Sequence, residues 1–209
     1  MTAEEVGKLL NVSRETLCQF EAYLTLLEKW QRRINLVSNS TMANVWQRHI
    51  LDSAQLFRFC PPNTKKILDV GSGKGFLLHD LKQLNEQFEI AGIDISEYAL
   101  EHAVDDVREH CVHGCASALP FEDNYFDLVI SINTLHNLCQ RDLWRALYEI
   151  NRVGKAKKFI CVESYRNIRE KVNLLYWQLT CRSFFSVEDW EFIFTKTSYD
   201  GDYEFIFFE

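Results

Sequence analysis

A glycine-rich turn in the middle of the chain could hold a ligand against backbone N–H groups. The apolar run Ile67-Leu68-Asp69-Val70 leads into Gly71-Ser72-Gly73-Lys74-Gly75, and closely spaced glycines allow such an approach. A P-loop needs Ser or Thr after its lysine, and a dinucleotide fingerprint needs Gly-x-Gly-x-x-Gly spacing. The turn therefore favours a nucleoside ligand without a pyrophosphate. The alternative is a tight strand-to-helix turn that binds nothing.

Asp94 is the second residue of this predicted ligand site. It ends the run Phe88-Glu89-Ile90-Ala91-Gly92-Ile93, and a carboxylate at the end of a second strand can bind both ribose hydroxyls. Its alternative role is to cap the next helix, but Ser96 can serve as that cap.

Several side chains at predicted strand ends could accept a proton or orient an acceptor. His136 follows the fourth strand, Glu163 and Tyr165 follow the fifth, and His49 with Asp52 lies near the start of the chain. Each has a structural alternative: a polar helix start for His136, or a His–Asp hydrogen bond for the last pair. We expect His136 and Glu163 to be the catalytic candidates.

Potential metal ligands crowd the stretch from His110 through Cys111 and His113 to Cys115. Alternation along a strand would divide these side chains between two faces, so we expect no metal site. The seven cysteines of the chain include no Cys-x-x-Cys pair, which predicts reduced thiols.

The elements that position these residues belong to a chain with the composition of a soluble globular protein. Of 209 residues, 47% are hydrophobic and 25% are charged, which excludes a disordered chain or a coiled coil. No apolar run approaches the roughly 18 residues of a membrane span, and the acidic start is unlike a signal peptide. We expect a cytoplasmic protein that contacts no membrane.

Charge is distributed unevenly along the chain. Residues 1–66 carry a formal +3 and residues 67–209 carry −10. Such an acidic body is a poor general polyanion binder, so we expect no DNA partner, although a basic patch on the first part could contact RNA. The alternative is a solvated helical face.

Two regions follow from the hydrophobic pattern. Residues 1–64 have helical spacing, with a capping box at Thr2 and Glu5, a cap at Ser13 and a further helix over 41–59. Residues 65–209 alternate short β-rich runs with helical ones. We predict strands at 66–70, 88–93, 111–115, 126–132, 158–163 and 203–208, and helices at 75–85, 97–109, 140–152, 167–181 and 187–196. This is a doubly wound, Rossmann-like α/β fold with a mostly parallel sheet, helices on both faces and an N-terminal helical extension.

Residues 66–163 resemble class I S-adenosylmethionine (SAM) dependent methyltransferases of the broad small-molecule type. The resemblance rests on the glycine-rich turn, Asp94 and the later segments 114–121, 126–131 and 133–138. It implies SAM as cofactor and S-adenosyl-L-homocysteine as product. It also implies contacts from Asp69, Gly71, Ser72, Gly73 and Gly75 to the methionine part, from Asp94 to the ribose, from Ile95, Ala116 and Ser117 to adenine, and from Asn133 beneath the sulfonium. Cys115 departs from the family, which often has an acid there to contact the adenine amino group.

The first part of the chain resembles a different branch, the RsmG (GidB) methyltransferases of bacterial small-subunit ribosomal RNA, which modify a guanine at N7. The resemblance rests on Leu27 to Ser38 and on Arg48 to Ser53, and it covers about residues 3–75. It then fades, because Leu77-Leu78 follows Gly75-Phe76 where Pro-Gly is expected. The two resemblances together imply a composite of two branches, with a natural divergent enzyme, a fusion and an engineered chimera as the alternatives.

The methyl acceptor is the least determined feature. We expect a small-molecule acceptor ahead of RNA, with ribosomal RNA guanine-N7 methylation and a catalytically silent SAM-binding protein as alternatives. Arg166, Trp177, His49 and Asp52 are candidate substrate contacts. The last strand has an apolar edge that suits a hairpin partner or a dimer contact, so the chain is predicted to be a monomer or a homodimer.

Overall fold

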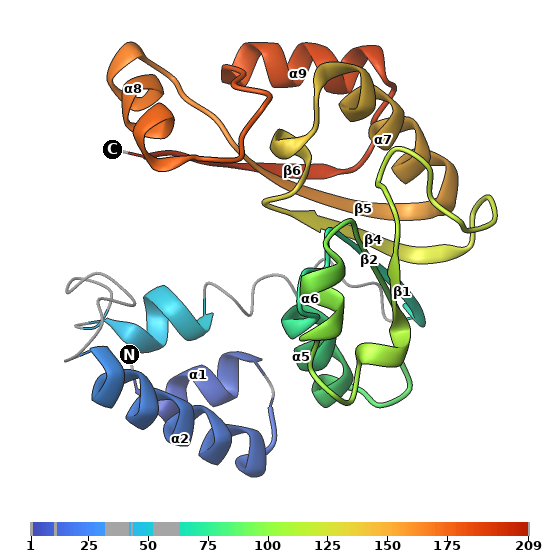
Figure 1. Cartoon of the computed structure of the whole chain (residues 1–209). Coiled ribbons are helices and arrows are strands. Elements are labelled where there is room, and N and C mark those ends of the chain that lie inside the picture. Colours follow the sequence, from blue (N-terminus) through green and yellow to red (C-terminus); the bar gives the residue numbers. More distant parts are fainter. Residues whose placement is uncertain (1, 11, 32–41, 43, 52–62, 209) are drawn as a thin grey trace. The chain divides into compact units, whose positions relative to one another are not determined.

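The computed structural model describes residues 2–10, 12–31, 42, 44–51 and 63–208 (Figure 1). The chain divides into two compact units, residues 1–61 and residues 62–209. Within the described residues, no helix combines the length and the apolar character needed to cross a membrane.

The first unit is helical. It contains α1 (Ala3–Leu10), α2 (Arg14–Gln31) and the π-helical turn η1 (Trp46–Leu51). The predicted capping box is confirmed, since the Thr2 N–H donates to Glu5 Oε2 at 2.8 Å and the Glu5 N–H donates to Thr2 Oγ1 at 3.3 Å. Ser13 caps α2 by accepting the Thr16 N–H. A small apolar cluster of Val6, Leu24, Leu27 and Ile50 holds the unit together.

The second unit is built on a six-stranded sheet, which confirms the predicted fold class. Its strands are β1 (Lys66–Val70), β2 (Glu89–Asp94), β3 (Cys111–His113), β4 (Phe126–Ile132), β5 (Gly154–Glu163) and β6 (Asp202–Ile206). All five pairings in the order β3-β2-β1-β4-β5-β6 are parallel. The chain runs outward in both directions from β1, and in such sheets ligands bind at the carboxyl ends of the strands beside this reversal.

Helices cover both faces of the sheet. Figure 1 shows α5 (Phe76–Leu84) and α6 (Glu97–Glu101) on one side and α7 (Gln140–Val153) and α9 (Val187–Lys196) on the other, with α8 (Ile168–Trp177) near the C-terminal end of the chain. Two short 3₁₀ turns complete the unit, η3 (Arg108–His110) and η4 (Leu135–Asn137). The largest buried apolar cluster lies between the sheet and α7 with α9, and it includes Leu68, Val129, Leu147 and Trp190. A second cluster, centred on Leu78, lies beneath α5.

The predicted helix over 97–109 is wrong beyond Glu101. Residues 102–107 form turns because they contact α5 and the glycine-rich turn instead. His79 Nδ1 lies 2.9 Å from the Asp106 carboxylate, and the Val104 N–H donates to the Lys74 carbonyl. The predicted strand 111–115 also ends early, at His113. Tertiary contacts here outweigh local helix propensity.

Candidate functional site

The glycine-rich turn joins the carboxyl end of β1 to α5 and is anchored to β2. The N–H groups of Gly71 and Ser72 both donate to the Ile93 carbonyl, at 2.8 and 3.1 Å. Gly71, Gly73 and Gly75 all have positive φ, at 85°, 53° and 75°. This backbone conformation is costly for other residues, which is why the sequence has glycine at these positions.

Two of these glycines have different surroundings. A Cβ on Gly71 would lie 1.9 Å from Thr134 Oγ1, so close packing against the β4 loop requires glycine there. A Cβ on Gly73 would meet no atom within 4 Å. Gly73 therefore borders open space at the carboxyl edge of the sheet, as a ligand-binding turn requires.

Asp94 connects this turn to the start of α6. Its Oδ2 accepts the Gly73 N–H and its Oδ1 accepts the Ser96 N–H, both at 2.8 Å. Ser96 caps α6 by accepting the Ala99 N–H, as predicted. Asp94 is therefore not the side chain that caps α6. It links the glycine-rich turn to the residues before α6.

Asp69 is a buried carboxyl group, with only 4% of its surface exposed. No hydrogen bond among the described residues ends on its side chain. Burial, followed by repulsion from Asp94, raises the pKa of Asp69 to about 7. A cationic group of a ligand would satisfy this carboxylate and lower its pKa again.

The loops that carry the residues expected around adenine lie next to each other. The Gly114 N–H donates to the Asp94 carbonyl, which brings the loop after β3 to the end of β2. Ile95 is exposed, Ala116 is buried and Ser117 is half-buried. Cys115 Sγ lies 3.0 Å from Ser117 Oγ, so the residue that departs from the family pairs with a predicted adenine contact.

The stretch with the potential metal ligands contacts the end of β2. His113 Nε2 lies 3.1 Å from the Ile95 carbonyl, and within the described part of the chain no group of three or more His, Cys, Asp or Glu could hold a metal ion.

Asn133 lies at the carboxyl end of β4, next to Thr134, whose side chain packs on Gly71. It is exposed, has a φ of 54° and donates its N–H to the Cys161 carbonyl. A non-glycine residue in this conformation is uncommon outside functional or strained loops. The structure thus brings Asn133 to the same edge as the glycine-rich turn.

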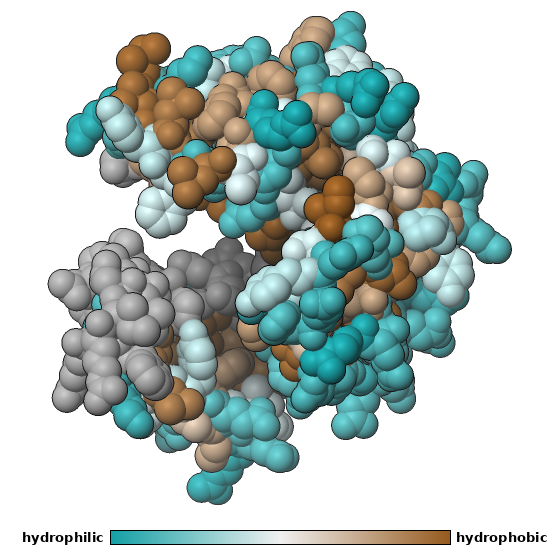
Figure 2. Space-filling view, in the orientation of Figure 1, coloured by the Kyte–Doolittle hydropathy of each residue, from teal (hydrophilic) through white to brown (hydrophobic). Residues whose placement is uncertain are grey.

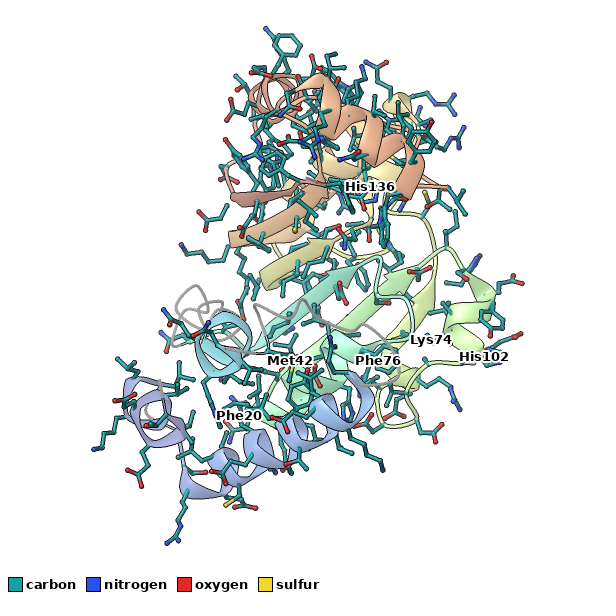
Figure 3. The ribbon with its side chains drawn as sticks, turned by 90° about the vertical axis from the view of Figure 1, so that its left-hand side faces the viewer. Phe20, Met42, Lys74, Phe76, His102 and His136 are labelled. Atoms are coloured by element: carbon teal, nitrogen blue, oxygen red, sulfur yellow. The ribbon has the colours of Figure 1, made fainter. Side chains whose placement is uncertain are left out.

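His136 and Glu163 form a buried pair between the ends of β4 and β5 (Figure 3 labels His136). They are 1% and 4% exposed, and His136 Nε2 lies 3.6 Å from Glu163 Oε2. The Glu163 N–H donates to His136 Nδ1 at 3.4 Å, so the ring proton belongs on Nε2, facing the carboxylate. Burial lowers the pKa of His136 to about 4 and raises that of Glu163.

Gln178 completes this cluster and was missed by the sequence reasoning. Its Nε2 donates to Glu163 Oε1 in a short hydrogen bond, while Glu163 Oε2 is buried without a hydrogen-bond partner among the described residues. Gln178 lies 15 residues from Glu163, and no local pattern links the two.

The structure describes two of the four candidate substrate side chains, Arg166 and Trp177. Arg166 is ion-paired with Glu170 at 2.5 Å and lies over the Phe207 ring, and Trp177 is exposed beside Phe208. Asp52 and the side chain of His49 lie outside the described residues. Their predicted roles stay predictions.

A cavity of about 710 Å³ lies at the opposite ends of the strands. It is lined by residues such as Lys66, Glu89 and Tyr125, and Lys66 already pairs with Glu89 at 3.6 Å and lies over the Tyr125 ring. The cavity is remote from the carboxyl edge where the turn and Asp94 meet.

Comparisons with known proteins match two overlapping parts of the chain to two family models. Residues 68–162 match a family model described as a methyltransferase domain, and residues 16–95 match one described as rRNA small subunit methyltransferase G. The Ribosomal RNA small subunit methyltransferase G of Rhodospirillum rubrum is 55% identical over 76 residues, which are 36% of this chain and 38% of that protein. Its counterpart from Parvibaculum lavamentivorans is 50% identical over 74 residues, which are 35% and 33%. The chain spans about a third of the length of these curated relatives.

Solved structures support the fold of the second unit. A SAM-dependent methyltransferase from Archaeoglobus fulgidus matches with a TM-score of 0.56 at 22% identity, over 71% of this chain and 67% of that one. At this identity the match establishes the fold alone. The family models confirm the resemblance predicted from the motifs: the chain is similar to a methyltransferase domain over residues 68–162 and to rRNA small subunit methyltransferase G over residues 16–95.

Proposed function

We propose that this protein is a SAM-dependent methyltransferase. The observation that carries the proposal is the pairing of an unsatisfied buried carboxylate, Asp69, with an open glycine turn that Asp94 ties to β2. An ammonium group suits Asp69, hydroxyl groups suit the remaining lone pairs of Asp94, and Gly73 leaves room for the ligand. Ile95, Ala116 and Ser117 would border the adenine, and Asn133 would lie beneath the sulfonium.

Bound SAM would supply a methyl group attached to a positively charged sulfur, and the sulfur would leave as a neutral thioether as the acceptor's lone pair bonds to the methyl carbon. The residues of this chain then act mainly by positioning, because an in-line displacement depends on alignment of the reacting atoms. Asp69, Asp94 and the turn would fix the donor at the carboxyl ends of β1 and β2.

His136 and Glu163 are proposed as positioning residues. Both are almost fully buried, and both nitrogens of His136 face Glu163. The pair links the loop after β4 to the end of β5, the two segments beside which an acceptor would lie. A neutral His136 beside a protonated Glu163 would leave no full charge buried, which is consistent with the raised pKa of Glu163.

RNA is the proposed acceptor class. The identity to proteins named for small-subunit ribosomal RNA methylation is 50% or more over about 75 residues, which supports the alternative that the motifs of the first part suggested. The predicted preference for a small-molecule acceptor is not confirmed by the comparisons.

A small-molecule acceptor stays as the second candidate because of one observation. The match to the ribosomal RNA family ends at residue 95, before β4 and β5, whose ends would face the acceptor. These strands fall instead within the general methyltransferase match.

Labelled methyl transfer tests the proposal. The full chain is incubated with SAM carrying a labelled methyl group and a bacterial extract that includes undermethylated small ribosomal subunits, and the products are separated into RNA, protein and small molecules. Label in RNA is expected. Label in small molecules would favour the second candidate, and calorimetry without any SAM binding would reject methyltransferase function.

A further inference from the structure

We infer that the surface around α8 binds single-stranded RNA and guides it to the carboxyl edge of the sheet. This surface, called the α8 surface below, consists of Arg169, Tyr176, Trp177, Leu179 and Arg182. The inference rests on the proposed function and extends it, because the match to the ribosomal RNA family does not reach these residues.

Charge is the first argument. Residues 164–182 contain four basic residues and one acid, a formal +3 in a region, 67–209, that carries −10 overall. The acid, Glu170, is buried and paired with Arg166. Arg169 and Arg182 are exposed, and their side chains make no hydrogen bond or ion pair with any described residue. A concentrated positive charge with free guanidinium groups suits phosphates.

Exposed aromatic side chains are the second argument. Tyr176 is 86% exposed and Trp177 is 67% exposed, and Leu179 nearby is 97% exposed. Figure 2 shows hydrophobic residues gathered over α8 with hydrophilic ones beside them. Unpaired bases stack on such rings in RNA-binding proteins. Arginines next to exposed aromatics favour a single strand or loop over a duplex.

Position is the third argument. The segment after α8 is fastened to the loop after β4, because the N–H groups of Arg182 and Ser183 both donate to the His136 carbonyl, at 2.9 and 3.0 Å. Thr180 Oγ1 donates to Asn137 Oδ1 at 2.9 Å, and Gln178 donates to Glu163. The segment that directly follows α8 and carries Leu179 and Arg182 is thus fastened to the strand ends where the acceptor would lie.

Two other occupants fit less well. A symmetric pair of copies would place the same positive surface on both sides of the contact, so the free arginines would repel one another. An anionic lipid surface would repel the strongly acidic remainder of residues 67–209. RNA can contact the α8 surface alone while the acidic remainder stays in solvent.

The test compares matched variants of the full chain. Binding to a fluorescein-labelled single-stranded RNA of about 20 nucleotides is followed by anisotropy at several salt concentrations. The double variants Arg169→Glu/Arg182→Glu and Tyr176→Ala/Trp177→Ala should each bind at least about tenfold more weakly, and the charge reversal should lower the salt slope by about 2. The controls are Arg141→Glu/Arg145→Glu, with the same charge change on α7, and Tyr148→Ala, an exposed aromatic of α7. They should stay within about twofold of wild type.

Each other outcome decides against the inference. Equal losses in the α7 controls would mean that only net charge matters, and undiminished binding in the α8 variants, or no RNA binding by wild type, would reject the surface. A wild-type dimer in sedimentation velocity that the α8 variants dissociate would make a second copy the occupant. Co-sedimentation with phosphatidylserine vesicles, lost in the same variants, would make it a lipid surface. SAM calorimetry on every variant separates these failures from failure of the proposed function, since all should bind SAM as wild type does.

Discussion

At the scale of single residues, buried ionisable groups are held in states that cost folding free energy. Asp69 has a raised pKa without a donor, and His136 has a lowered one beside Glu163. A protein keeps such groups when a ligand or a specific geometry compensates for them, as at many functional sites. Asp69 is the clearer case, because its burial disfavours the ionised form and the structure describes no partner for it.

Asp69→Asn should abolish detectable SAM binding in calorimetry while stabilising the free protein above neutral pH. The folded pKa of Asp69 lies above its unfolded value, so wild-type stability falls as pH rises from about 4 to about 7. The difference in unfolding free energy between variant and wild type should therefore grow by up to about 4 kcal/mol over that range. Urea unfolding at pH 4.5 and 8 measures it, with Asp105→Asn as an exposed control. A difference that does not change with pH would contradict the burial of a lone carboxyl group.

The pH response of His136 has the opposite sign. Its folded pKa of about 4 lies below the unfolded value, so its contribution to stability is lost as pH falls from about 6.5 to about 4. Over this pH range, the unfolding free energy of His136→Gln should fall by up to about 3 kcal/mol less than that of wild type. The comparison is made by urea unfolding in the same buffers, and an unchanged acid slope would show that His136 is not held neutral by burial.

At the scale of elements, two glycines of the turn between β1 and α5 have different surroundings. Gly71 packs on Thr134 and Gly73 faces open space, although both have positive φ. The backbone strain of a substitution is similar at both positions, so the difference between the two comes from their surroundings.

Gly71→Ala and Gly73→Ala should therefore have different effects on stability and on SAM binding. Gly73→Ala should cost about 1–2 kcal/mol of stability from backbone strain and weaken SAM binding at least tenfold. Gly71→Ala should cost more stability, since its Cβ would collide with Thr134. Thermal unfolding measures the stability of both variants, and calorimetry measures their affinity for SAM. Normal SAM affinity in a folded Gly73→Ala protein would place the ligand elsewhere.

At the scale of the whole molecule, the two resemblances overlap within the second unit. The residues proposed for SAM all lie within residues 62–209, while the similarity to the ribosomal RNA enzymes covers residues 16–95 and so includes most of the first unit together with β1 and β2. The first unit can thus contribute to the choice of the acceptor without contributing to the proposed cofactor site.

A chain shortened to residues 62–209 should bind SAM within about threefold of the full chain, because this unit has its own core and the whole glycine turn. Its methyl transfer to small ribosomal subunits should fall at least tenfold. Calorimetry and labelled transfer give the two readings. Circular dichroism establishes first that the fragment is folded, and full transfer by a folded fragment would remove the first unit from acceptor recognition.

Local sequence determined most of the elements of this protein. Short apolar runs, the Thr2 and Ser13 caps and the glycine turn predicted strands, helix starts and the α/β fold, because each depends on neighbours within a few residues. The sequence predicted a ligand-binding role for Asp94, and not a capping role, because Ser96 two residues later can cap the helix. The predicted helix over 97–109 failed where Asp106 and Val107 contact α5 and the turn, contacts that no local pattern encodes.

Only the tertiary structure decided how distant residues combine. His136, Glu163 and Gln178 come from three segments, and their mutual burial, which sets their protonation, exists only once β4, β5 and the segment after α8 are packed. The raised pKa of Asp69 likewise comes from burial and from Asp94 across the sheet. Sequence spacing fixes which groups are available, whereas desolvation and charge proximity depend on the three-dimensional packing that brings them together.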